Sequence, residues 1–133
     1  MSIAKAANSF DSDPVTNSDA PQGGRSPALA SFERMLASGK DGALLRYSIG
    51  NEYAKAKDWA AASESLAKAV ELDAQFTAAW KLYGRALVET GRPQDALVAY
   101  RQGIEVAKRK GDRQAEKEMT VFARRIERAL AEK

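Results

Sequence analysis

Two consecutive segments of equal length show how this chain folds. Residues 43–76 read ALLRYSIGNEYAKAKDWAAASESLAKAVELDAQF, and residues 77–110 read TAAWKLYGRALVETGRPQDALVAYRQGIEVAKRK, so the second follows the first at an offset of 34 residues without a gap. Gly50 coincides with Gly84, as expected where two helices approach closely. Large apolar residues also coincide: Ile49 with Tyr83, Tyr53 with Leu87, Leu66 with Tyr100 and Val70 with Ile104. A repeat of this length holds two helices, and such pairs stack because no pair buries its apolar face alone.

The second segment resembles the signature of the tetratricopeptide repeat (TPR) family. The matching residues are Trp80, Tyr83, Gly84, Leu87, Ala96, Tyr100 and Gly103. The first segment carries the same pattern at Ile49, Gly50, Tyr53, Ala62, Leu66 and Ala69, with Arg46 in place of the first aromatic. The resemblance is to short stand-alone bacterial TPR proteins. It implies an all-α fold, a right-handed α–α solenoid, and a protein-binding adaptor.

Periodic sequence on both sides of the two repeats predicts two further helices. Ser26 before Pro27 is a typical helix start, and the apolar spacing that follows predicts an N-terminal capping helix over 27–38. Apolar residues recur at helical spacing near the end of the chain, which predicts a C-terminal helix over 112–131. Side chains expected to cap helix N-termini are Asp41, Asp58, Thr77 and Asp112.

The folded domain is predicted to span residues 26–133. Residues 1–25 are rich in Asn, Ser, Asp, Pro and Gly and contain few large apolar side chains. Such a segment buries too little surface to offset the entropy of ordering it, so a disordered N-terminal tail is predicted for 1–25.

Composition argues against an enzyme. The chain contains no Cys and no His, which removes thiolate nucleophiles, histidine bases and most transition-metal sites. No Gly-rich phosphate loop is present, because Gly50 and Gly84 fall inside predicted helices. We therefore expect no enzymatic activity, no cofactor and no metal. The start of the chain has no apolar run typical of a signal peptide, and no segment is apolar enough to span a bilayer, so a cytoplasmic protein without membrane contact is expected.

The first helix of each TPR-like pair is expected to line a concave groove. Positions counted from Gly50 and Gly84 give the candidate peptide-binding residues Tyr47, Asn51, Lys55, Lys81, Arg85 and Val88. An amide and cations in one groove suit a protein or peptide with an acidic side chain or a C-terminal carboxylate. The set resembles in part the carboxylate clamp of chaperone-binding TPR domains: Asn51 matches its first asparagine, whereas Tyr47 replaces a lysine.

Two alternatives to groove binding stay open. Residues 101–133 hold ten basic and six acidic side chains, and this excess of positive charge would suit weak association with nucleic acid. The acidic side chains lie between the basic ones, which argues against such binding. A structural subunit that self-associates through an open solenoid end is the other alternative. The sequence identifies neither the partner nor the pathway nor the oligomeric state.

Overall fold

The computed structural model describes residues 26–132, and this part of the chain consists of six helices without strands. The helices are α2 (Pro27–Ala37), α3 (Ala43–Lys55), α4 (Trp59–Leu72), α5 (Thr77–Glu89), α6 (Pro93–Lys110) and α7 (Arg113–Ala131). The predicted all-α fold is confirmed. The predicted disordered tail, 1–25, lies outside the described residues.

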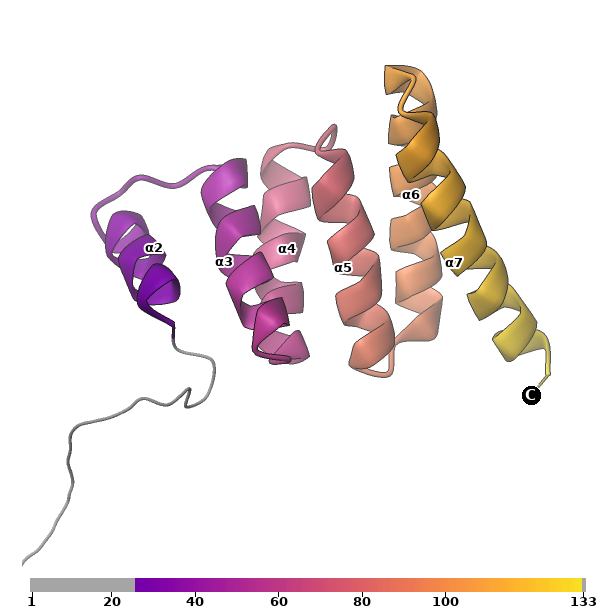
Figure 1. Ribbon diagram of the computed structural model, residues 1–133, viewed down its shortest axis with the longest axis horizontal. Helices are drawn as coiled ribbons and strands as arrows, with labels where there is room; N and C mark the ends of the chain where they lie inside the picture. Colours follow the sequence, from indigo (N-terminus) through magenta and orange to yellow (C-terminus); the bar gives the residue numbers. More distant parts are fainter. Residues whose placement is uncertain (1–25, 133) are drawn as a thin grey trace, which may run out of the picture.

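The helices stack in chain order into two layers. Helix α3 packs against α4 and α5 against α6, while α4 contacts α5 and α6 contacts α7. Figure 1 shows α3, α5 and α7 in the nearer layer, with α4 and α6 behind them. Within residues 26–132, none of the helices is long and apolar enough to cross a membrane. The arrangement is a solenoid of two helix pairs with one helix added at each end.

Glycines let the two helices of each pair approach closely. A β-carbon added at Gly84 of α5 would lie 2.6 Å from Cε1 of Tyr100 on α6, and one at Gly50 of α3 would lie 2.7 Å from Cγ of Leu66 on α4. Real β-carbons do not approach other atoms so closely. The large residue that fills the space on the second helix therefore requires glycine on the first, which explains why these positions recur in both repeats.

Three of the predicted N-terminal caps are formed. The Ser26 hydroxyl accepts a hydrogen bond from the Leu29 amide at 2.9 Å, and Asp58 and Asp112 accept from the amides of Ala61 and Ala115 at 3.3 and 3.1 Å, respectively. These bonds satisfy amide groups that have no partner inside the first turn of a helix. They account for the starts of α2, α4 and α7.

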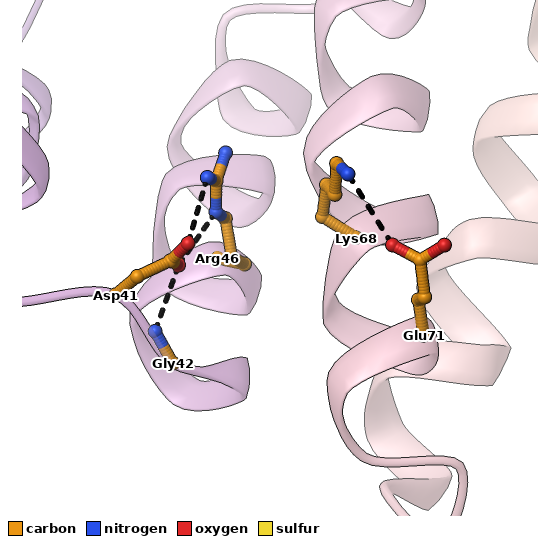
Figure 2. A network of polar contacts seen from close by, with 5 residues as sticks. All are labelled: Asp41, Gly42, Arg46, Lys68 and Glu71. Atoms are coloured by element: carbon orange, nitrogen blue, oxygen red, sulfur yellow. Dashed lines mark hydrogen bonds and ion pairs between the residues drawn. The ribbon is translucent and has the colours of Figure 1, made fainter.

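The predicted cap at Asp41 is wrong. Helix α3 has Gly42 at its cap position without a side-chain hydrogen bond. The Asp41 carboxylate instead accepts from the Gly42 amide and pairs with the Arg46 guanidinium, whose Nε lies 2.8 Å from Oδ1 and whose Nη2 lies 3.0 Å from Oδ2 (Figure 2). The Arg46 hydrogen bond lowers the pKa of Asp41 below its ordinary value. A bidentate pair with a guanidinium is stronger than a capping bond to a single backbone amide, and it gives Arg46 a partner at the position that Trp80 occupies in the second repeat.

The predicted cap at Thr77 is also wrong. Phe76 occupies the cap position of α5, and Thr77 is the first residue inside the helix. Its side chain is 8 % exposed, and Oγ1 has no hydrogen-bond partner among the described residues. The ring of Phe76 packs into an apolar cluster, where it lies 4.9 Å from the ring of Tyr47.

Both ends of the stack are covered. Helix α2 buries Leu29 against Leu45 and Ile49 of α3, as expected of a capping helix, and Phe32 packs against this cluster. At the other end, α7 buries Met119 against α6 and turns a different face outward. That outer face carries Arg113, Glu116, Lys117, Thr120, Val121 and Arg124. A further helix pair would need an apolar surface there, and Val121 alone does not provide one.

Candidate binding groove

A groove of about 700 Å³ lies on the face formed by α3, α5 and α7. Its lining includes five of the six residues selected from the sequence: Tyr47, Asn51, Lys81, Arg85 and Val88. Lys55 is not part of the lining, and its ammonium group pairs with Glu52 at 2.7 Å. The structure therefore brings the five residues together on one surface, while ligand binding by them stays a prediction.

Helical spacing explains why these side chains share the groove. Tyr47 and Asn51 are four residues apart on α3, as Lys81 and Arg85 are on α5, and side chains with this spacing lie on one helix face. Gly50 and Gly84 face the second helix of each pair, and the residues that follow them, Asn51 and Arg85, line the groove.

Lys81 is not a free cation, although the sequence suggested no packing role for it. Its Nζ lies 2.6 Å from Oε1 of Glu118 on α7, and Gln114 donates a further hydrogen bond to the same carboxylate at 2.8 Å. These contacts, that of Lys81 first, lower the pKa of Glu118. The pair joins α5 to α7 across the groove, so a ligand carboxylate would compete with Glu118 for Lys81.

Arg85 remains available to a ligand. Its guanidinium carbon lies 4.9 Å from the centre of the Trp59 ring, and its Nε is 3.9 Å from Oε2 of Glu89. The Arg85 side chain is nevertheless 62 % exposed. A contact with an aromatic face orients a guanidinium without using its five N–H donors. Trp59 thus positions Arg85 at the edge of the groove with donors left over.

Helix α7 forms a third wall that the sequence analysis missed. Phe122 is half-buried and lines the groove together with Arg125. The Phe122 ring lies 5.6 Å from that of Tyr100, and the Arg125 guanidinium lies 5.9 Å from the Phe122 ring centre. Glu118 and Phe122 are four residues apart, the same spacing as Lys81 and Arg85, and this was the signal available in the sequence.

The floor of the groove includes Tyr100 of α6. Tyr100 is only 3 % exposed, and burial raises the pKa of its hydroxyl from 10.0 to about 12. The positive charges of Arg85 and Arg125 act in the opposite direction and favour the ionised form. The hydroxyl therefore stays protonated at neutral pH and is able to donate a hydrogen bond.

The lining of the groove combines charged, polar and apolar side chains. Residues 26–132 contain no cluster of three or more Asp, Glu, His or Cys side chains able to hold a metal ion. The polar groups of the groove are three cations, two carboxylates, one amide and two phenols, set between apolar side chains such as Leu82, Val88 and Ile126. Such a surface recognises a ligand by charge, hydrogen bonds and apolar contact.

Comparisons with known proteins agree with this architecture. The tetratricopeptide repeat family model matches residues 53–115. A TPR repeat-containing protein of Pseudomonas aeruginosa is 46% identical over 101 residues, which cover 76% of this chain and 96% of that protein. The solution structure of a Bordetella parapertussis protein has 35% sequence identity and a TM-score of 0.68, and the match covers 79% of this chain and 91% of that one. These matches and the stacked helix pairs show that the chain belongs to the tetratricopeptide repeat family.

Proposed function

We propose that this chain is an adaptor that binds a segment of a partner protein in the groove between α3, α5 and α7. TPR repeats generally mediate protein–protein interaction. The observation that supports the groove as the site is the exposed Arg85, which is held by Trp59 next to the 40 % exposed Val88. Neither side chain serves the core, so both are free to contact a ligand.

The charges of the groove favour a partner segment with an acidic side chain or a C-terminal carboxylate. Lys81, Arg85 and Arg125 supply three positive charges, whereas Glu89 and Glu118 supply two negative ones. Glu118 is already engaged by Lys81. Arg125 forms no ion pair with any described residue. The net charge of the lining is thus positive.

The test begins with the capture of partners from cells and their identification, followed by a comparison of three variants. Arg85→Glu and Val88→Gln change exposed groove residues, whereas Arg124→Glu changes an exposed residue on the outer face of α7. We expect the two groove variants to lose the partner and the Arg124→Glu protein to retain it. Exposed substitutions usually change the free energy of unfolding by less than about 0.5 kcal/mol, so circular dichroism should show intact folding.

Lys81 is left unchanged in this design because its reversal would place two carboxylates where the Lys81–Glu118 pair joins α5 to α7. Loss of the partner in Arg124→Glu alone would refute groove binding. It would identify the basic outer face of α7 as the surface that binds the partner. A steep decrease of binding with salt concentration would then indicate that the partner is a nucleic acid.

A further inference from the structure

The positive charge of this chain is concentrated in its last two helices. Residues 27–100 hold nine basic and nine acidic side chains, whereas residues 101–133 hold ten basic and six acidic ones. Four exposed cations lie on the side of α7 that faces away from the core: Arg113, Lys117, Arg124 and Arg128. Spacings of four, seven and four residues place them on one face of the helix, over about 22 Å of its axis. We call these four residues the cationic row.

Most acidic side chains of the same segment are engaged elsewhere. The engaged ones are Glu105 with Lys108 at 3.7 Å, Asp112 with the Ala115 amide at 3.1 Å, Glu118 with Lys81 at 2.6 Å, and Glu127 with Arg101 at 2.6 Å. Glu116, on the outer face, and Glu132, after the end of α7, have no such partner among the described residues.

The cationic row itself is unpaired. None of its four members forms an ion pair with a residue in the described range 26–132. The interleaved acids, which counted against nucleic-acid binding in the sequence, therefore neutralise little of the row. Figure 1 shows α7 at one end of the stack, so the side away from α6 is open to a large partner.

We propose that the cationic row of α7 binds the phosphate backbone of a nucleic-acid duplex. The row is a second surface, separate from the groove, because Glu118, Phe122 and Arg125 line the groove from a different face of α7. The adaptor would then hold a protein segment on one side of α7 and a duplex on the other.

The composition of the outer face favours a duplex over other acidic partners. Its one large apolar side chain is Val121, which is 47 % exposed. A helix that binds an acidic membrane inserts its apolar face, whereas that face of α7 is buried, with Met119 and Ile126 in the core. Protein interfaces are centred on aromatic, Met or Arg anchors in packed pockets, and single-stranded nucleic acid stacks on aromatic rings. Contacts to a duplex backbone need only exposed Arg and Lys.

The length of the row matches the charge density of a duplex. A duplex carries one negative charge per about 1.7 Å of its axis, so about 22 Å of α7 faces about 13 phosphate charges. If all four cations neutralise a phosphate, the logarithm of the association constant should fall with the logarithm of the salt concentration with a slope of about −3.6. Affinity should then fall about 100-fold between about 50 and 200 mM salt. Binding without contacts to base edges should depend little on base sequence.

Fluorescence anisotropy with the full-length protein tests this surface. The probes are a labelled DNA duplex of about 25 base pairs, the RNA duplex of the same sequence and the single DNA strand. Polyglutamate and vesicles that contain phosphatidylserine serve as competitors. We expect at least one duplex to bind with the steep salt dependence given above, and the single strand and both competitors to bind more weakly.

A pair of matched double variants assigns the binding to the row. Lys117→Gln with Arg124→Gln removes two of its charges, whereas Arg34→Gln with Lys40→Gln removes one Arg and one Lys that are exposed at the other end of the stack. The first pair should weaken duplex binding by at least about tenfold and reduce the salt slope by about 1.8. The second pair has the same net charge and should bind nearly like the unchanged protein.

Four outcomes would overturn the proposal. They are the absence of binding to both duplexes at about 50 mM salt, equal loss of binding in the two double variants, a single strand bound at least as tightly as the duplexes, and a competitor bound more tightly than the duplexes with the same dependence on Lys117 and Arg124.

Failure of this surface is separable from failure of the groove. Val88→Gln leaves the net charge unchanged, so it should lose the protein partner and keep the duplex, whereas the variant with Lys117→Gln and Arg124→Gln should do the reverse. Loss of the duplex in Val88→Gln would place the nucleic acid in the groove and overturn the assignment to the row.

Discussion

Replacing Gly84 with alanine tests the close packing that defines the second helix pair. The added β-carbon would lie 2.6, 2.7 and 2.8 Å from Cε1, Cζ and Cδ1 of the Tyr100 ring, whereas carbon atoms in good contact are about 3.5–4.0 Å apart. The ring would therefore have to move by about 1 Å. Tyr100 is buried and packs against Phe122, so it has no open space to move into on that side.

Two opposing terms set the size of the effect. Alanine is more favourable than glycine in a helix interior by about 1 kcal/mol. Overpacking of a filled core costs about 1–3 kcal/mol. The cost at Gly84 should lie near the upper value, because the added β-carbon would collide with three atoms of a rigid ring. We therefore expect Gly84→Ala to lower the free energy of unfolding by about 1–2 kcal/mol. For a domain of this size the melting temperature should fall by roughly 5–10 °C.

Denaturant unfolding of four proteins checks this reasoning: the unchanged chain, Gly84→Ala, Tyr100→Leu and the double variant. Leucine lacks the ring atoms that meet the new β-carbon. The loss of unfolding free energy in the double variant should therefore be smaller than the sum of the losses in the two single variants, by about 1 kcal/mol. Tyr100→Phe retains all three ring atoms and should give no such relief. A Gly84→Ala protein that is about 1 kcal/mol more stable, with no coupling to Tyr100, would refute the claim that the ring requires glycine.

Four further predictions concern stability. Thr77→Val removes the buried hydroxyl that lacks a partner, so thermal unfolding should show unchanged or higher stability, by up to about 1 kcal/mol; a clear loss would mean that the hydroxyl is bonded. Phe32→Ala should cost roughly 2 kcal/mol in denaturant unfolding because Phe32 is half-buried against α3, and a loss under about 0.5 kcal/mol would show that α2 is not a cap. The pKa of Glu118 is lowered in the fold, so the ionised carboxylate stabilises the folded state above pH 4.5, and this stabilisation is lost as the pH falls through the folded pKa. On acidification, Glu118→Gln should therefore lose less of its free energy of unfolding than the unchanged chain. The pKa of Tyr100 is raised to about 12, so the protonated phenol stabilises the folded state below pH 10.0, and this stabilisation is lost as the pH rises toward 12. Tyr100→Phe should therefore unfold at a higher pH than the unchanged chain. Equal alkaline unfolding curves would contradict the burial of the phenol.

The helices and their pairing follow from local patterns in the sequence. The recurrence of Gly50 at Gly84, with a large residue sixteen positions after each, describes a contact between two adjacent helices. Contacts of this kind involve residues close in the chain, and their geometry is fixed by helical spacing and one short turn. Caps such as Asp58 and Asp112 are similarly local, because the bond forms three residues away. Asp41 departed from the pattern when a guanidinium five residues away offered a stronger bond.

The way in which α7 completes the groove depends on the packing of whole helices. The second helix of the first pair, α4, has 14 residues, whereas its counterpart α6 has 18, so the period of 34 residues does not carry over to α7. The rotation of α7 about its own axis is set by packing, with the Met119 sulfur against Gly103 of α6. That rotation turns Glu118 toward Lys81 and places the Phe122 ring, with Arg125 over it, beside the ring of Tyr100. Residues so far apart in the chain meet only through the packing of whole helices, and a pattern of spacings within one helix does not contain that information.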